Sequence, residues 1–174
     1  MRLFIAINLS KEVKDYLFDL QKEFRKFGKF NFVAKKNLHL TLKFFGETNK
    51  LDLIKEKLNK INSKSFEVSL SSIGIFPDED SIRVLWVDLN PKDKILELAK
   101  TIDQELIEFP NDYSFSYHIT LARVKLIKNK KEFINKLRIK TKSIKFKVNS
   151  FELMKSELSK DGPKYTSLET YFLI

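Results

Sequence analysis

The stretch NLHLTLKFFGE, residues 37–47, decides how the rest of the sequence is read. It places His39 in the frame His-x-Thr-Leu, inside an alternation of polar and apolar residues that predicts a short, half-buried β-strand. The other histidine, His118, stands in the same frame within SFSYHITLARVK, residues 114–125. Both histidines of the chain therefore occupy one motif, and that motif occurs twice.

The two frames stand at matching points of a repeated order of elements. Each predicted strand leads to a helical pattern, then to a long strand, a turn and another long strand. The strands that follow the helices begin near Phe66 and Phe146, at nearly equal distances from His39 and His118. We therefore expect two similar α+β halves related by a pseudo-twofold axis, with the two histidine frames facing each other.

Length and composition limit the class of protein. The chain has 174 residues, which fits one domain of two interlocked lobes over residues 1–174. It has no cysteine, which excludes disulfides, zinc–thiolate sites and a cysteine nucleophile. No apolar run is long enough for a membrane span, and the opening residues do not resemble a signal peptide. We therefore expect a cytoplasmic protein with no membrane partner.

The formal net charge of +10 indicates a polyanionic partner, of which RNA or DNA is the usual one. A lysine-rich surface without any such partner explains the charge equally well.

Strand geometry separates the side chains of each frame. Because alternate residues of a strand share a face, His39 and Thr41 point one way while the neighbouring leucines point into a core. His118 and Thr120 do the same in the second half. Each half thus offers one imidazole and one hydroxyl on a free face.

The same alternation makes predictions for two basic residues. Lys43 should share the face of His39, where we expect it to be solvated. Arg123 stands at an odd offset from His118 and should point away from the histidine face.

Three interpretations of the histidines compete. A single strand histidine is most often a structural residue, but here both histidines occupy the repeated frame. A metal site is the second, yet two histidines without cysteine or a nearby carboxylate fall short of the three protein ligands of a catalytic zinc. The third is a metal-free acid–base pair, because histidine titrates near neutrality and threonine hydroxyls can hold phosphoryl oxygens. The third interpretation suits displacement at phosphorus, and it agrees with the basic charge.

At these residues the sequence resembles the two-histidine (2H) phosphoesterase superfamily, and most closely its LigT-like RNA 2′,3′-cyclic phosphodiesterases, also called 2′-5′ RNA ligases. The resemblance covers nearly the whole chain, through RLFIAI, NLHLTLKFFGE, IGIFP with RVLWV, HITLARV and FELMKSELSKDGPKYTSLETYFL. It implies an α+β fold of two pseudo-symmetric lobes whose antiparallel sheets form a concave cleft. It also implies hydrolysis of RNA 2′,3′-cyclic phosphate ends to 2′-phosphate ends, without metal or other cofactor, and reversible 2′-5′ ligation as a minor activity.

The resemblance assigns roles to residues of this chain. His118 is similar to the family's proton acceptor, which activates water, and His39 to its proton donor, which protonates the leaving 3′-oxygen. Thr41 and Thr120 would bind the phosphate oxygens, and Arg123 resembles an arginine that can contact substrate. The expected partner is RNA with a cyclic phosphate end, such as a tRNA fragment, bound by a monomer.

Two other functions stay open on the sequence. One is a non-catalytic RNA-binding module of the same fold, and the other is a phosphodiesterase for small cyclic or 2′-5′ linked nucleotides. The aromatic residues Phe45, Phe76, Trp86 and Tyr117 could stack on a base, although core packing is the expectation for most of them.

Overall fold

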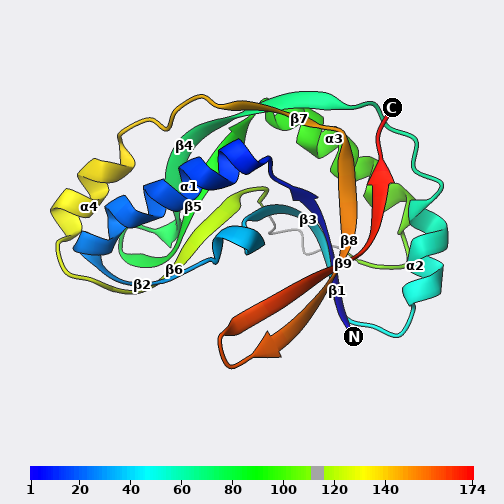
Figure 1. Ribbon diagram of the computed structural model, residues 1–174, viewed down its shortest axis with the longest axis horizontal. Helices are drawn as coiled ribbons and strands as arrows, with labels where there is room; N and C mark the ends of the chain where they lie inside the picture. The colour runs from blue at the N-terminus through cyan, green and yellow to red at the C-terminus, as the bar shows by residue number, and fades with distance from the viewer. Residues whose placement is uncertain (111–115) are drawn as a thin grey trace.

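The computed structural model describes residues 1–110 and 116–174 and has an α+β fold, shown in Figure 1. Within these residues, strands and helices follow one another along the chain as β1 (Arg2–Asn8), α1 (Lys11–Phe24), β2 (Gly28–Phe32), β3 (His39–Glu47), α2 (Leu51–Leu58), β4 (Phe66–Asp78), β5 (Ser81–Asn90), α3 (Lys92–Glu105), β6 (Ile119–Ile127), α4 (Lys130–Leu137), β7 (Lys145–Val148), β8 (Ser150–Ser159) and β9 (Gly162–Phe172). Short 3-10 turns, Arg25–Phe27 and Lys35–Asn37, precede β2 and β3.

The predicted amphipathic patterns form the helices. In α1 the Ser10 hydroxyl accepts a hydrogen bond from the Val13 amide at 3.3 Å, which caps the first turn. One side of this helix is buried through Val13, Leu17, Leu20 and Phe24. These side chains join the core that fills the space between the helices and the sheet. Burial of this apolar stripe, more than helix propensity, holds α1 in place.

The strands form one antiparallel sheet in the order β7-β4-β5-β6-β3-β1-β8-β9, with β2 paired to β6. Its centre is the junction of β3 and β6, which pair through Leu40 and Ile119. On one side of this junction β3, β1, β8 and β9 form a first lobe, and on the other side β6, β5, β4 and β7 form a second lobe. Each lobe contains strands from both halves of the chain, because β4 joins the second lobe and β8 joins the first.

The two faces of the sheet differ. The alternating residues Leu85, Val87 and Leu89 of β5 are buried in the core under the helices, and we call this side the helix-covered face. The opposite side carries Trp86, which alternates with these buried residues on β5, and His39, and it is called the open face. In Figure 1, α1 and α4 lie together over the second lobe, and α2 lies at the other end of the molecule. The four helices of the described residues include none that is both long and apolar enough to cross a membrane.

A β-bulge interrupts each histidine strand at the leucine of its frame. On β3, Ala6 pairs with Thr41 but Ile5 pairs with Lys43, so Leu42 is an extra residue. On β6, Trp86 pairs with Thr120 but Leu85 pairs with Ala122, which makes Leu121 the extra residue.

The bulges reverse the alternation of each strand after the leucine. On β3 both Leu42 and Lys43 are buried, and on β6 both Leu121 and Ala122 are buried. Beyond the bulge, odd and even positions have exchanged faces. This repeated irregularity determines which side chains reach the open face.

Candidate active site

His39 lies at the start of β3 with its imidazole on the open face. Its Nδ1 is 2.6 Å from the carbonyl oxygen of Asn37. Because a carbonyl only accepts hydrogen bonds, Nδ1 carries the proton and the neutral ring presents an unprotonated Nε2. That Nε2 is 2.8 Å from the hydroxyl oxygen of Thr41, which donates to it. The rings of Phe4 and Tyr165 pack against the imidazole, with centroids at 5.2 Å and 5.4 Å.

His118 is held in the same way immediately before β6. Its Nδ1 is 2.5 Å from the carbonyl oxygen of Ser116, so here too Nδ1 is the donor and Nε2 is the nitrogen available for proton transfer. The ring of Phe76 meets the imidazole edge-on at 4.9 Å between centroids, and that of Trp86 lies at 6.0 Å. Trp86 can lie this close to the sheet because it is paired with Gly74, where any Cβ would meet the indole ring at 2.2 Å.

The structure brings the two frames together crosswise. In an antiparallel pair the residues on either side of a paired couple also face each other. The pairing of Leu40 with Ile119 therefore sets His39 opposite Thr120 and Thr41 opposite His118. Thr41 is 8% exposed and Thr120 is half-buried, both on the open face.

Arg123 lies on a different face of the sheet from the one predicted from the sequence. Its odd offset from His118 predicted that it points away from the histidines, and this is wrong because the bulge at Leu121 reverses the alternation. Arg123 pairs with Val84, which lies on the same face of β5 as Trp86. Its guanidinium is near enough to Tyr165 to oppose the effect of burial, which raises the pKa of that phenol. Arg123 thus lies on the open face, the face that also carries the histidines.

Lys43 was predicted to share the face of His39, and the structure places it on the other face. The bulge at Leu42 turns it to the helix-covered face, where its side chain is 1% exposed and its Nζ is 3.0 Å from Asp103 Oδ1 of α3. The expectation of a solvated lysine beside His39 is therefore wrong. Phe44 takes the corresponding place on the open face, with its ring 6.2 Å from Phe4.

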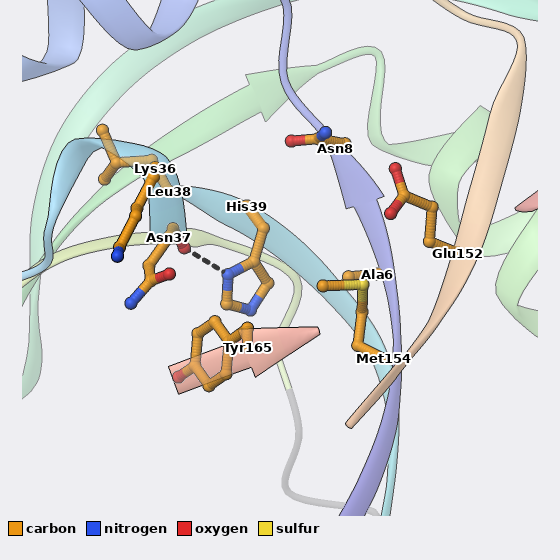
Figure 2. Close-up of a pocket in the computed structure, with 9 residues that line it drawn as sticks. All are labelled: Ala6, Asn8, Lys36, Asn37, Leu38, His39, Glu152, Met154 and Tyr165. Atoms are coloured by element: carbon orange, nitrogen blue, oxygen red, sulfur yellow. Dashed lines mark hydrogen bonds between the residues drawn. The ribbon is translucent and has the colours of Figure 1, made fainter. Parts of the chain in front are cut away.

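A cavity of about 160 Å³ opens beside His39 (Figure 2). In Figure 2 Asn8 projects into it from β1, Glu152 and Met154 from β8, and Tyr165 from β9. Simple alternation did not identify these residues. They come from strands far from residue 39 in the sequence, and only the sheet order brings them to the histidine.

The hairpin of β8 and β9 is hydrogen-bonded to Asn37, the residue whose carbonyl holds the His39 imidazole. The Asn37 side chain donates to the Pro163 carbonyl at 2.9 Å, while its own carbonyl accepts from His39. One residue therefore links the hairpin, the cavity and the imidazole.

Burial lowers the pKa of both histidines below their ordinary value. For His39 the burial is reinforced by the charges of Lys14 and His118, while the carbonyl of Asn37 opposes it. For His118 the carbonyl of Ser116 and the charge of Asp88 oppose the lowering of the pKa by burial. The influence of His118 on His39 shows that the two imidazoles lie within electrostatic reach. Burial therefore favours the neutral form of both rings.

The aromatic residues have different surroundings. Phe76 and Trp86 stack on each other at 4.7 Å and line the His118 side, whereas Phe45 packs edge-on against Phe109. Phe76 and Trp86 are thus the aromatic pair next to His118, as Phe4 and Tyr165 are next to His39.

Over residues 1–110 and 116–174, no three His, Cys, Asp or Glu side chains gather in a way that could hold a metal ion. Within that part of the chain the two frames and Arg123 bring imidazoles, hydroxyls and a guanidinium to one face, and such groups can hold an anion and move protons.

Comparison with known proteins gives consistent matches. The family described as LigT like Phosphoesterase matches residues 7–86 and again 87–165. The RNA 2′,3′-cyclic phosphodiesterase of Methanocaldococcus jannaschii is 33% identical over 177 residues, covering 98% of this chain and 100% of that protein. The enzyme of the same name from Archaeoglobus fulgidus is 31% identical over 98% of this chain and 99% of its own.

Solved structures share the fold. A crystal structure of the Thermus thermophilus protein TT0787 matches with a TM-score of 0.85 and 30% identity, over 99% of this chain and 97% of that one. Escherichia coli LigT complexed with phosphate matches with a TM-score of 0.78 and 25% identity, over 99% and 96%. The two matched segments of the family each contain one histidine frame.

Proposed function

The chain belongs to the LigT-like phosphoesterase family, and we propose that it hydrolyses RNA 2′,3′-cyclic phosphate ends to 2′-phosphate ends. Its relatives bear the name of that activity at about a third identity over nearly their full length. The observation that carries the proposal is the crosswise meeting of the two frames. Around Leu40 and Ile119, two imidazoles and two threonines converge on one face of the sheet.

The proton positions suit displacement at phosphorus. Each Nδ1 is committed to a backbone carbonyl, so each ring has one nitrogen, Nε2, for proton transfer. His118 Nε2 takes a proton from water while the water oxygen forms a bond to phosphorus. The bond from phosphorus to the 3′-oxygen breaks, and protonated His39 gives its Nε2 proton to that oxygen. The products are a 2′-phosphomonoester and a 3′-hydroxyl, and solvent resets both rings.

Three further residues would stabilise the charge that builds on phosphorus. Thr41 and Thr120 donate to the non-bridging oxygens, and the Arg123 guanidinium adds a positive charge beside them. When His39 is protonated, its Nε2–H donates to the Thr41 hydroxyl oxygen, which orients the proton donor and frees the hydroxyl proton for the phosphate.

The cavity beside His39 is the place for the terminal nucleoside. The 3′-oxygen that receives the proton of His39 belongs to the terminal ribose, so ribose and base must lie on that side. Tyr165 and Met154 provide apolar surface there, while Asn8 and Glu152 provide polar groups.

The charge of the chain bears on the kind of substrate it binds. The net charge of +10 supports an RNA partner, such as a tRNA fragment, over a mononucleotide. Replacing water by an RNA 5′-hydroxyl and reversing the steps would join ends through a 2′-5′ bond as a minor activity. We further infer that residues 1–174 act as one domain and as a monomer, in the cytoplasm and without a metal.

One experiment tests this function. The protein is incubated in EDTA with an RNA ending in a 2′,3′-cyclic phosphate, and the product end is identified. We expect a 2′-phosphate at an undiminished rate. A 3′-phosphate product would refute the roles of the histidines, and loss of activity that one divalent ion restores would refute the metal-free mechanism. Turnover of small cyclic nucleotides alone, or binding without cleavage, would support the alternative functions.

A further inference from the structure

Two residues occupy equivalent positions next to the histidines. Asn8, at the end of β1, pairs directly with His39. The pairing of Val87 with Ile119 sets Asp88 of β5 opposite His118 by the same geometry. Asn8 Oδ1 accepts from the Leu9 amide at 3.0 Å, and Asp88 Oδ1 accepts from the Leu89 amide at 2.9 Å. The two residues thus have the same local conformation in each half.

Their charges differ. Asn8 is neutral, whereas Asp88 is a carboxylate that is 9% exposed, with its Oδ2 2.8 Å from Lys92 Nζ. A carboxylate in such a shielded position interacts more strongly with its neighbours than one in water. The two histidine frames are therefore alike in geometry but not in electrostatics.

We propose that Asp88 is a positioning residue that makes His118 the proton acceptor of the pair, while neutral Asn8 leaves His39 as the proton donor. This inference rests on the proposed hydrolysis and assigns the two roles from the structure.

The charged groups around each ring support the assignment. On the His118 side the described residues include Asp88 with its partner Lys92, the aromatic rings of Phe76 and Trp86, and the carbonyl of Ser116. The carboxylate of Asp88 opposes the lowering of the His118 pKa by burial.

On the His39 side the charged groups include Lys14, Lys36 and Glu152. Arg123 is near Tyr165, whose ring packs on the imidazole. Lys14 Nζ donates to the Lys36 carbonyl at 3.2 Å, and its charge lowers the pKa of His39. Glu152 interacts with Lys14, not directly with the imidazole.

These surroundings suit opposite proton transfers. A base that ends the step as an imidazolium gains from a nearby carboxylate, and an acid that ends it neutral gains from a nearby cation. Asp88 stabilises the imidazolium that forms on His118. Lys14 and the absence of a carboxylate at Asn8 favour release of the proton from His39.

NMR titration of the full-length protein tests the inference without relying on activity. The two histidine resonances are assigned with His39→Gln. In Asp88→Asn the Oδ1 acceptor for Leu89 is kept while the charge is lost. We expect the pKa of His118 to fall by roughly half a unit or more, with that of His39 nearly unchanged. The limb of the pH–rate profile that belongs to His118 should move by the same amount, and the rate should fall about three- to tenfold.

Lys92→Met is the matched control, because it breaks the same ion pair but leaves the carboxylate. It should raise the pKa of His118, opposite to Asp88→Asn, whereas a merely structural effect of the ion pair would act alike in both variants. Asn8→Asp should raise the pKa of His39 and slow the reaction. An unchanged His118 titration in Asp88→Asn, a shift in the same direction in Lys92→Met, or a faster reaction in Asn8→Asp would overturn the proposal. The expected titrations in a protein that does not cleave cyclic-phosphate RNA would instead refute the proposed function.

Discussion

Leu40 of β3 pairs directly with Ile119 of β6, and both side chains are buried on the helix-covered face. Each leaves the histidine and threonine of its frame on the open face. The pair is the point through which the pseudo-twofold axis of the sheet passes. Several consequences of this arrangement can be measured.

Replacing either histidine should abolish most of the activity. Because each ring performs a different proton transfer, His39→Ala and His118→Ala should each lower the rate on cyclic-phosphate RNA by about 10²–10⁴. The double variant should be little slower than either single one, since both act in one transition state. Initial rates of the folded variants check this, and a loss below about tenfold in either would contradict the paired mechanism.

Removing the Arg123 charge should weaken catalysis more than removing a neighbouring one. Arg123→Gln should reduce kcat/KM by about tenfold or more, because the guanidinium lies on the open face, which also carries the histidines. Lys125→Gln removes an equal charge from an exposed position on the same strand and serves as control. Equal losses in the two variants would mean that only overall charge matters.

The bulge at Leu121 should depend on Gln21 of α1. This buried side chain donates from Nε2 to the Leu121 carbonyl at 2.8 Å and to the Val33 carbonyl at 2.9 Å. Gln21→Leu leaves both carbonyls with fewer donors and should cost about 1–3 kcal/mol of unfolding free energy.

Because the bulge directs Arg123 to the open face, Gln21→Leu should also lower activity although Gln21 lies under the sheet. Combined with Arg123→Gln, the activity loss should be less than additive. Fully additive losses would show that Gln21 does not act through the bulge.

Acidification should destabilise the protein through its histidines. Burial lowers the pKa of His39 and of His118 from the ordinary 6.5, so the folded protein takes up these protons later than the unfolded chain as the pH falls. Their neutral forms therefore contribute stability above about pH 6.5, and this contribution is lost as the pH falls through the lowered values. Urea unfolding at about pH 7.5 and about pH 5.5 measures the loss.

The variant with both histidines replaced by glutamine should lose less stability over the same interval, since its carboxylates are unchanged. An equal loss would assign the acid sensitivity to other groups.

The sequence predicted the helices, the strands and the two frames because local periodicity determines them. It failed at Lys43 and Arg123 for one reason, the bulge in each strand. On β3 the alternation His39 to Phe44 runs without a break, so nothing local signals the bulge. On β6 the adjacent apolar residues Leu121 and Ala122 do break the alternation, and this break indicates the bulge.

Asn8 and Glu152 could not be predicted as neighbours of His39. They reach it only through the pairing of β1 with β3 and of β1 with β8, which depends on contacts distant in sequence. Their position beside His39 depends on the order of strands in the sheet, and the periodicity of the sequence does not predict that order.

The exchange of β4 and β8 between lobes affects how the chain responds to being cut. The turn between β4 and β5 is closed by the Asp78 carboxylate, which accepts from the amides of Asp80 and Ser81. Cleavage there yields two fragments, each holding a long strand whose ladder partner is on the other. Neither fragment owns a complete lobe, and each carries only one histidine. We therefore expect the nicked protein to behave as a fragment-complementation pair, in which the two histidine frames meet only while the two pieces are associated.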